Sequence, residues 1–156
     1  MSFRISGLDP REFTDYAAMT DAELARHRAK RCTATEYPGY PCRVTLDDAQ
    51  PGEEVILLNY EHLPVDSPYR SSHAIYVRAG ATRPYEGLDE VPPALARRLL
   101  SVRAFDAAGN MVSGEVLEGR DLAPYLEAQL ANREVAYLHA HYARRGCFAA
   151  RIDRAA

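Results

Sequence analysis

The segment Tyr137–Tyr142 places two histidines, His139 and His141, two positions apart. Residues at this spacing on a β-strand point to the same face, so the two imidazoles would lie side by side. Neutral imidazoles bind divalent transition metals, and this pair would hold one ion if a third ligand joined it. The candidates for the third ligand are His62, His73, Cys147 and a carboxylate. The alternative interpretation is a pair of surface histidines, or of core histidines held by hydrogen bonds.

A cysteine, Cys147, follows the turn 144–146, which contains two arginines. A tight hairpin would bring Cys147 close to the end of the strand that carries His141. A thiol beside an imidazole and a guanidinium has a lowered pKa and acts as a nucleophile, so Cys147 and His141 are candidate catalytic residues. The competing interpretation is a small buried hydrophobic residue, a common role for free cysteine. Cys42 beside Arg43 allows the same two interpretations.

A second polar cluster spans residues 70–73, with an arginine, two serines and a histidine in consecutive positions. Arginine binds carboxylates and phosphates in a bidentate way, so Arg70 and Ser72 are candidates to hold an anion. The competing interpretation is a turn whose hydroxyls cap backbone groups. If the fold gathers them, five side chains would line one pocket for a small anion: Arg43, Arg70, Ser72, His73 and Arg145.

The charge of the chain argues against a nucleic-acid partner. The 156 residues carry a net charge of −3, whereas nucleic-acid-binding proteins usually show a basic excess or a basic stripe. Lys30 is the only lysine among 19 Lys and Arg residues, which leaves 18 arginines. Any anion site in this chain must therefore be built from arginine.

The cysteines and the apolar runs bear on the compartment. Three cysteines without a CxxC motif form neither a disulfide framework nor a zinc ribbon. The first residues contain no apolar signal, and the longest aliphatic run, Val55–Leu58, is too short to cross a bilayer. We therefore expect a cytoplasmic protein with reduced thiols and no membrane partner. Nucleotide-binding loops and the GxSxG and HExxH motifs are also absent.

Capping patterns near the N-terminus predict helices over Pro10–Ala18 and Asp21–Lys30. Asp121 begins a third predicted helix, and Ala94–Arg97 a helical turn. Seven segments have alternating or apolar patterns that predict strands: Cys42–Leu46, Val55–Glu61, Ser71–Arg78, Leu99–Phe105, Met111–Leu117, Val135–Tyr142 and Cys147–Ile152.

The links between consecutive predicted strands are mostly short, whereas parallel strands need crossovers of a dozen or more residues. The sheet should therefore be mostly antiparallel. We expect one α+β domain over residues 1–156, with about six or seven strands and about three helices, two of them N-terminal.

Several segments of the chain, taken in order, resemble a known family. They are Pro41–Leu46, Leu58–Tyr60, Pro68–Ile75, Val102–Asp106, Ala136–His141 and Arg145–Cys147. These segments resemble the bacterial family called domain of unknown function 1203, and the resemblance runs from Phe3 to about Arg154. It implies a single-domain bacterial protein, and it brings no activity, ligand or catalytic residue with it.

Three hypotheses of function follow from these residues. The leading one is the binding of a small anionic ligand in a pocket of arginines and histidines. The second is an enzyme that uses either a divalent metal on His139 and His141 or a nucleophile at Cys147. The third is a non-catalytic interaction module or homodimer, formed through a sheet edge or the Tyr37–Pro41 loop. The first two depend on distant segments that converge in space.

Overall fold

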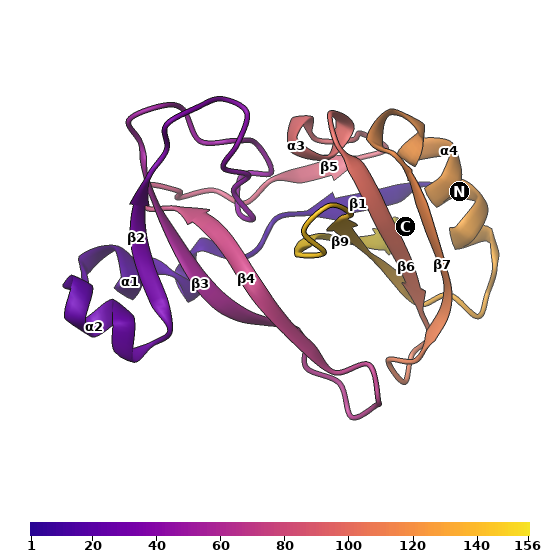
Figure 1. The fold of residues 1–156 in the computed structure, drawn as a ribbon. Coiled ribbons are helices and arrows are strands. Elements are labelled where there is room, and N and C mark those ends of the chain that lie inside the picture. The colour runs from indigo at the N-terminus through magenta and orange to yellow at the C-terminus, as the bar shows by residue number, and fades with distance from the viewer.

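The computed structural model describes residues 1–156 and contains two antiparallel sheets, which lie side by side in Figure 1. The large sheet is formed by β1 (Phe3–Ser6), β5 (Glu86–Leu88), β6 (Leu99–Phe105), β7 (Met111–Glu118), β8 (Tyr137–Tyr142) and β9 (Phe148–Arg154), in the order β5-β1-β9-β8-β6-β7. The small sheet is formed by β2 (Ala29–Thr33), β3 (Glu54–Leu63) and β4 (Ser71–Arg78), in the order β2-β3-β4. The predicted α+β class with a mostly antiparallel sheet is confirmed.

Four α-helices and two 3-10 turns complete the fold. The helices are α1 (Thr14–Ala18), α2 (Asp21–Arg26), α3 (Pro93–Ala96) and α4 (Leu122–Ala131), and the turns are Pro10–Glu12 and Gly119–Asp121. The predicted capping box is present in α2, where Thr20 and Glu23 each bond the other's backbone N–H. In Figure 1, α1 and α2 lie beside the small sheet, and α4 lies at the outer side of the large sheet.

Some predicted elements were wrong in their bounds or in their type. The second helix ends at Arg26 rather than Lys30, because Arg28 adopts a φ of 54° and the chain turns there into β2. The predicted strand Cys42–Leu46 is a loop that makes only isolated bridges, and Leu46 has a φ of 51°. The three strands that were not predicted are short, with four, five and three residues in β1, β2 and β5.

Strand β8 is buried along its whole length, and its two faces differ in chemistry. Leu138, Ala140 and Tyr142 belong to the main hydrophobic core together with three leucines of α4, Leu122, Leu126 and Leu130. Each buried leucine contributes about 1.5–3 kcal/mol, so this packing fixes which face of β8 points into the main core. The other face, with Tyr137, His139 and His141, is therefore directed away from α4.

Hydrogen bonds at several places connect the large sheet to the rest of the chain, and two of them lie in loops that border it. The buried guanidinium of Arg43 donates to the carbonyl oxygen of Phe148 at 2.7 Å and to that of Pro41 at 2.6 Å, and so anchors the loop 41–46 on β9. In a second contact, Ser67 Oγ donates to the carbonyl oxygen of Gly109 at 2.8 Å. This bond links the β3–β4 loop to the β6–β7 turn.

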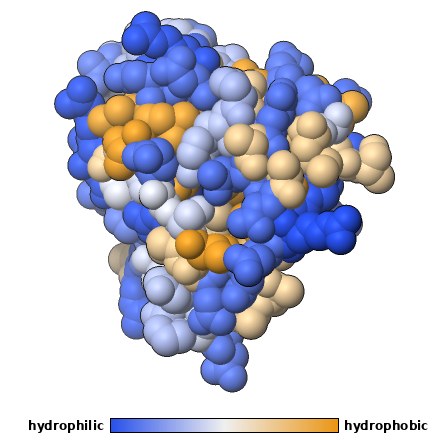
Figure 2. Space-filling model, turned by 90° about the vertical axis from the view of Figure 1, so that its right-hand side faces the viewer, coloured by the Kyte–Doolittle hydropathy of each residue, from blue (hydrophilic) through white to orange (hydrophobic).

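The surface carries its apolar groups in separate patches. Figure 2 shows such patches among hydrophilic side chains on one face of the molecule. The exposed large hydrophobic residues include Val112 and Val116 of β7, which are 39% and 55% exposed. None of the helices has the length and apolar character that crossing a membrane requires.

Gly119 should be required for the close approach of its turn to α3. A Cβ at this position would collide with the carbonyl oxygen of Leu95. We expect Gly119→Ala to lower the free energy of unfolding by about 2–3 kcal/mol, because backbone must move to accept the methyl group. Urea denaturation monitored by circular dichroism measures this.

The matched control is Gly80→Ala, since a Cβ at Gly80 would meet nothing within 4 Å. This change should alter the stability by no more than about 0.5 kcal/mol. Equal effects of the two substitutions would show that the approach of Gly119 to α3 is not under steric constraint.

Candidate metal centre

Three imidazoles from the two sheets meet at one place. His139 and His141 come from β8, and His62 comes from the end of β3. One ring nitrogen of each lies within 4.8 Å of those of the others. The ring centroid of His62 lies 5.0 Å from that of His141 and 5.9 Å from that of His139. The structure thus brings together the histidine pair and one of the candidates for a third ligand.

A β-bulge directs His62 toward the pair. Tyr60 pairs with His73 and Leu63 with Ser71, so two residues of β3 stand opposite one residue of β4 between them. A bulge of this kind changes the direction of a side chain. His62 and Leu63 are consequently both buried, although they are neighbours on one strand, and His62 is 9% exposed.

Phe148 forms an apolar wall of the cluster. It pairs with His141 because a second bulge shifts the register between β8 and β9. Its ring stacks on His62 with centroids 5.1 Å apart and an interplanar angle of 6°, and it meets the ring of His139 edge-on at 4.9 Å. Phe105 of β6 packs against His139 from another side, at 5.3 Å. The imidazoles therefore lie among aromatic rings.

Each of the three histidines has a buried ring nitrogen without a hydrogen-bond partner. These atoms are Nδ1 of His62, Nδ1 of His139 and Nε2 of His141. A buried polar atom that lacks a partner costs about 1–3 kcal/mol. The other nitrogen of His141, Nδ1, lies 2.9 Å from the carbonyl oxygen of Gly146, which only accepts, so Nδ1 carries the proton. Nε2 of His141 then presents a lone pair, as in metal-binding histidines whose second nitrogen donates to the protein.

Burial keeps these imidazoles neutral. It lowers the pKa of His62 to about 4, that of His139 to about 2 and that of His141 to about 3. The positive charge of Arg103 and the neighbouring imidazoles lower these pKa values further. At neutral pH all three rings are therefore neutral, with one nitrogen protonated and the other free, which is the form that binds a metal.

Arg103 of β6 lies beside the cluster and was not predicted. It pairs with His139, and Ser101 pairs with His141, so both side chains share the face of the histidines. Nε of Arg103 donates to Oγ of Ser101 at 3.3 Å, and burial lowers the pKa of the guanidinium. The sequence signal that could have pointed to Arg103 is the pair of polar residues, Ser101 and Arg103, at alternate positions of the predicted strand 99–105. The sequence did not show that β6 lies next to β8.

The five residues predicted for an anion pocket occupy different surroundings. Arg43 is buried, bonded to two carbonyl oxygens and placed over the ring of Tyr142. Arg70 is exposed and forms an ion pair with Glu61 at 3.1 Å. Ser72 is exposed, His73 is partly exposed with Nδ1 3.2 Å from the carbonyl oxygen of Ala74, and Arg145 is exposed in the β8–β9 turn. The structure does not bring these five into one group.

Cys147 lies outside the group of three histidines, in the main hydrophobic core with Tyr142. Its side chain is 8% exposed. Cys42 is buried as well, and its Sγ accepts a hydrogen bond from the backbone N–H of Arg78 at 3.3 Å. In the structure, both thiols have the surroundings of packed core residues.

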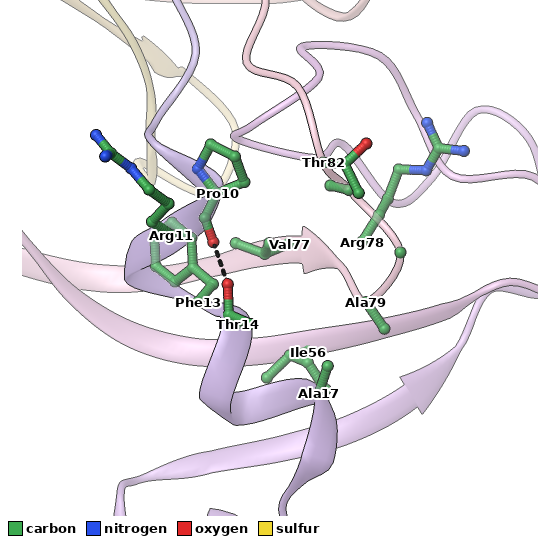
Figure 3. Close-up of a pocket in the computed structure, with 12 residues that line it drawn as sticks. Pro10, Arg11, Phe13, Thr14, Ala17, Ile56, Val77, Arg78, Ala79 and Thr82 are labelled. Atoms are coloured by element: carbon green, nitrogen blue, oxygen red, sulfur yellow. Dashed lines mark hydrogen bonds between the residues drawn. The ribbon is translucent and has the colours of Figure 1, made fainter.

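A hollow of about 290 Å³ lies on the small sheet, away from the histidines, and is lined by Phe13, Ile56 and Val77 (Figure 3). Two arginines stand at its sides and point in opposite directions. Arg11 is paired with Asp9 at 2.7 Å and Arg78 with Glu53 at 2.5 Å. These charges are already neutralised, so this hollow offers apolar surface but no reactive group.

Fold and site together define an antiparallel α+β protein with a buried cluster of three histidines between two sheets. The family model described as "Protein of unknown function (DUF1203)" matches residues 39–154. The chain belongs to this family, as the resemblance of its segments predicted. The match includes all three histidines and Arg103. Neither the comparison with curated proteins nor that with solved structures found a match.

The buried histidines predict that the metal-free protein loses stability in mild acid. In the unfolded chain a histidine takes up a proton near pH 6.5, whereas in the folded protein these rings do so only at pH 4 or below. Between these values the unfolded state binds more protons. The stability should therefore be constant above pH 6.5 and fall below it, by up to about 1.4 kcal/mol per pH unit for each histidine.

Urea unfolding in EDTA between pH 7.5 and pH 5 measures this slope. His62→Phe removes one buried imidazole and should make the slope shallower, whereas His27→Gln changes an exposed histidine and should leave it as it is. If His62→Phe has the slope of the wild type, His62 is not buried in its neutral form.

Proposed function

We propose that this protein binds one divalent transition-metal ion through His62, His139 and His141 and uses it as a catalytic centre. The observation that carries the proposal is the convergence of three buried, neutral imidazoles with unpartnered nitrogens. Ligation through these nitrogens would give them the partners that they lack within the protein.

The spacing of the rings supports binding after a small adjustment. Metal–nitrogen bonds of 2.0–2.1 Å in a tetrahedral site place the ligand nitrogens about 3.4 Å apart. The nitrogens here lie within 4.8 Å of one another. A movement of the rings toward one another would close this difference, and His62 sits on a bulge at the end of its strand.

The ligand set favours a catalytic site over a structural one. Structural zinc sites are closed by four protein ligands, whereas catalytic sites have three and keep one position open. Three imidazoles without a thiolate or carboxylate suit zinc, copper, nickel or iron rather than magnesium or calcium. An ion with three neutral ligands keeps its full charge, so it lowers the pKa of a bound water or polarises a carbonyl group.

The aromatic walls support the same function. Phe105 and Phe148 border the imidazoles and limit the access of bulk water. Electrostatic interactions with the ion are strengthened in such surroundings. The reaction class that fits is metal-assisted attack of water on a polarised substrate, with the chain supplying the ion's position.

All three cysteines of the chain are free. Reduced thiols are typical of the cytoplasm, which we propose as the compartment of the protein. None of the thiols belongs to the histidine cluster, so oxidation of a cysteine would not remove a ligand.

The purified protein, with any polyhistidine tag removed, should contain about one transition-metal ion per chain. Metal-free protein should take up Zn²⁺ or Co²⁺ in the same ratio, and an excess of a hundredfold over the dissociation constant should stabilise it by about 2.7 kcal/mol. Elemental analysis, the visible spectrum of the Co²⁺ form and thermal unfolding measure these properties.

His62→Phe and His139→Phe should each weaken metal binding by more than about a hundredfold. Each removes a metal ligand itself, and loss of a residue that only supports a ligand already weakens binding by about ten- to a hundredfold. His73→Gln is the matched control, because His73 lies on the neighbouring strand β4 outside the cluster. Circular dichroism checks that the variants are folded. Wild-type protein that is neither loaded nor stabilised by Zn²⁺, Co²⁺, Ni²⁺ or Fe²⁺ would disprove the metal centre.

A further inference from the structure

We propose that Arg103 makes this centre selective for a small oxyanion, which binds the metal at the open position and the guanidinium of Arg103 at the same time. The inference rests on the proposed metal centre and names the class of its substrate: a carboxylate or an inorganic oxyanion.

The first step is the lack of partners around Arg103. Five arginines of the chain are not exposed: Arg31, Arg43, Arg78, Arg98 and Arg103. Three of them form ion pairs with carboxylates, and Arg43 donates to two carbonyl oxygens. Arg103 has only its bond from Nε to Oγ of Ser101, so its two Nη groups have no partner in the protein.

A partly buried charge without a partner is costly, and proteins normally pair such groups. Arg103 has neither a carboxylate nor a carbonyl oxygen as a partner, and its Nη atoms are not among the buried side-chain atoms that lack one, so they reach the solvent. The four other arginines with restricted exposure show that this chain supplies partners when the role of the arginine is structural. The free Nη groups of Arg103 are therefore available to a ligand.

The second step is the position of Arg103. It stands opposite His139 in the register of β6 and β8, on the face that carries both histidines of β8. Antiparallel partners have Cα atoms about 4.5–5.5 Å apart, so the guanidinium is within reach of whatever the imidazoles hold. Ser101, opposite His141, adds a hydroxyl whose oxygen accepts from Arg103 and whose hydrogen is free to donate.

The third step is the balance of charge. The group of ligating atoms contains three neutral imidazoles and no carboxylate. A divalent ion would bring two positive charges next to the one on Arg103. Positive charges in partly buried surroundings favour a counter-charge, and an anionic ligand would supply it.

The chemistry of the two cations defines the ligand. Arginine binds two oxygens of a carboxylate, phosphate or sulfate with parallel hydrogen bonds, and a metal ion accepts an oxygen of the same groups. The aromatic rings of Phe105 and Phe148 next to the histidines favour a small ligand. An oxyanion of few atoms satisfies both cations at once.

Titration of the Co²⁺-loaded protein with sodium acetate and, separately, with sodium sulfate tests the inference. The visible spectrum of Co²⁺ should change and saturate with at least one of the two anions. Tighter binding of acetate would indicate a site for planar carboxylates, and tighter binding of sulfate a site for tetrahedral oxyanions. Arg103→Gln should retain the Co²⁺ and its spectrum but weaken anion binding by about tenfold or more, because charge-assisted hydrogen bonds are lost. Arg103→Lys should bind with intermediate affinity.

The matched control is Arg145→Gln, since Arg145 is an exposed arginine in the turn that follows β8. Its anion affinity should equal that of the wild type. Metal content is measured first in every sample, which separates the two proposals. A wild type that takes up no Co²⁺ contradicts the metal centre and this inference with it. If the Co²⁺-loaded wild type binds neither anion, or binds them with the same affinity as Arg103→Gln, the role of Arg103 is overturned while the metal centre stands.

Discussion

The burial of strand β8 on both faces is the constraint on which the site depends. One face must be apolar, because it packs against the leucines of α4 in the main core. The other face is closed by His62 and Leu63 of the small sheet and by Phe105 and Phe148 of the large one. Imidazoles placed on this second face lose contact with water and stay neutral. The same packing that stabilises the fold therefore keeps the rings in the neutral form that a metal ion can bind.

Local patterns were sufficient to predict part of this arrangement. The alternation within 137–142 placed His139 and His141 on one face, and the short turn predicted the β8–β9 hairpin. Both features depend on the pleat of a strand and on neighbours in the chain. The antiparallel α+β class followed from short connections in the same way. The loop 42–46 was mistaken for a strand because its buried residues resemble those of a strand.

The remaining parts of the site depend on long-range pairing, which local patterns do not contain. The predicted strand over 55–61 ended one residue before His62, and nothing in its alternation indicated the bulge that turns His62 inward. Arg103 was missed because β6 pairs with β8, although β7 and α4 lie between them in the chain. Such pairings are set by tertiary packing, so the sequence named two of the three clustered histidines and left the third among several candidates.

The position of His62 on a different sheet from the other two imidazoles has a mechanical consequence. An ion held by all three would act as a cross-link between the sheets, with β3 on one side and β8 on the other. The bond between Ser67 and Gly109 spans the same junction nearby. Occupancy of the centre would therefore stiffen the junction between the two sheets, and release of the ion would loosen it.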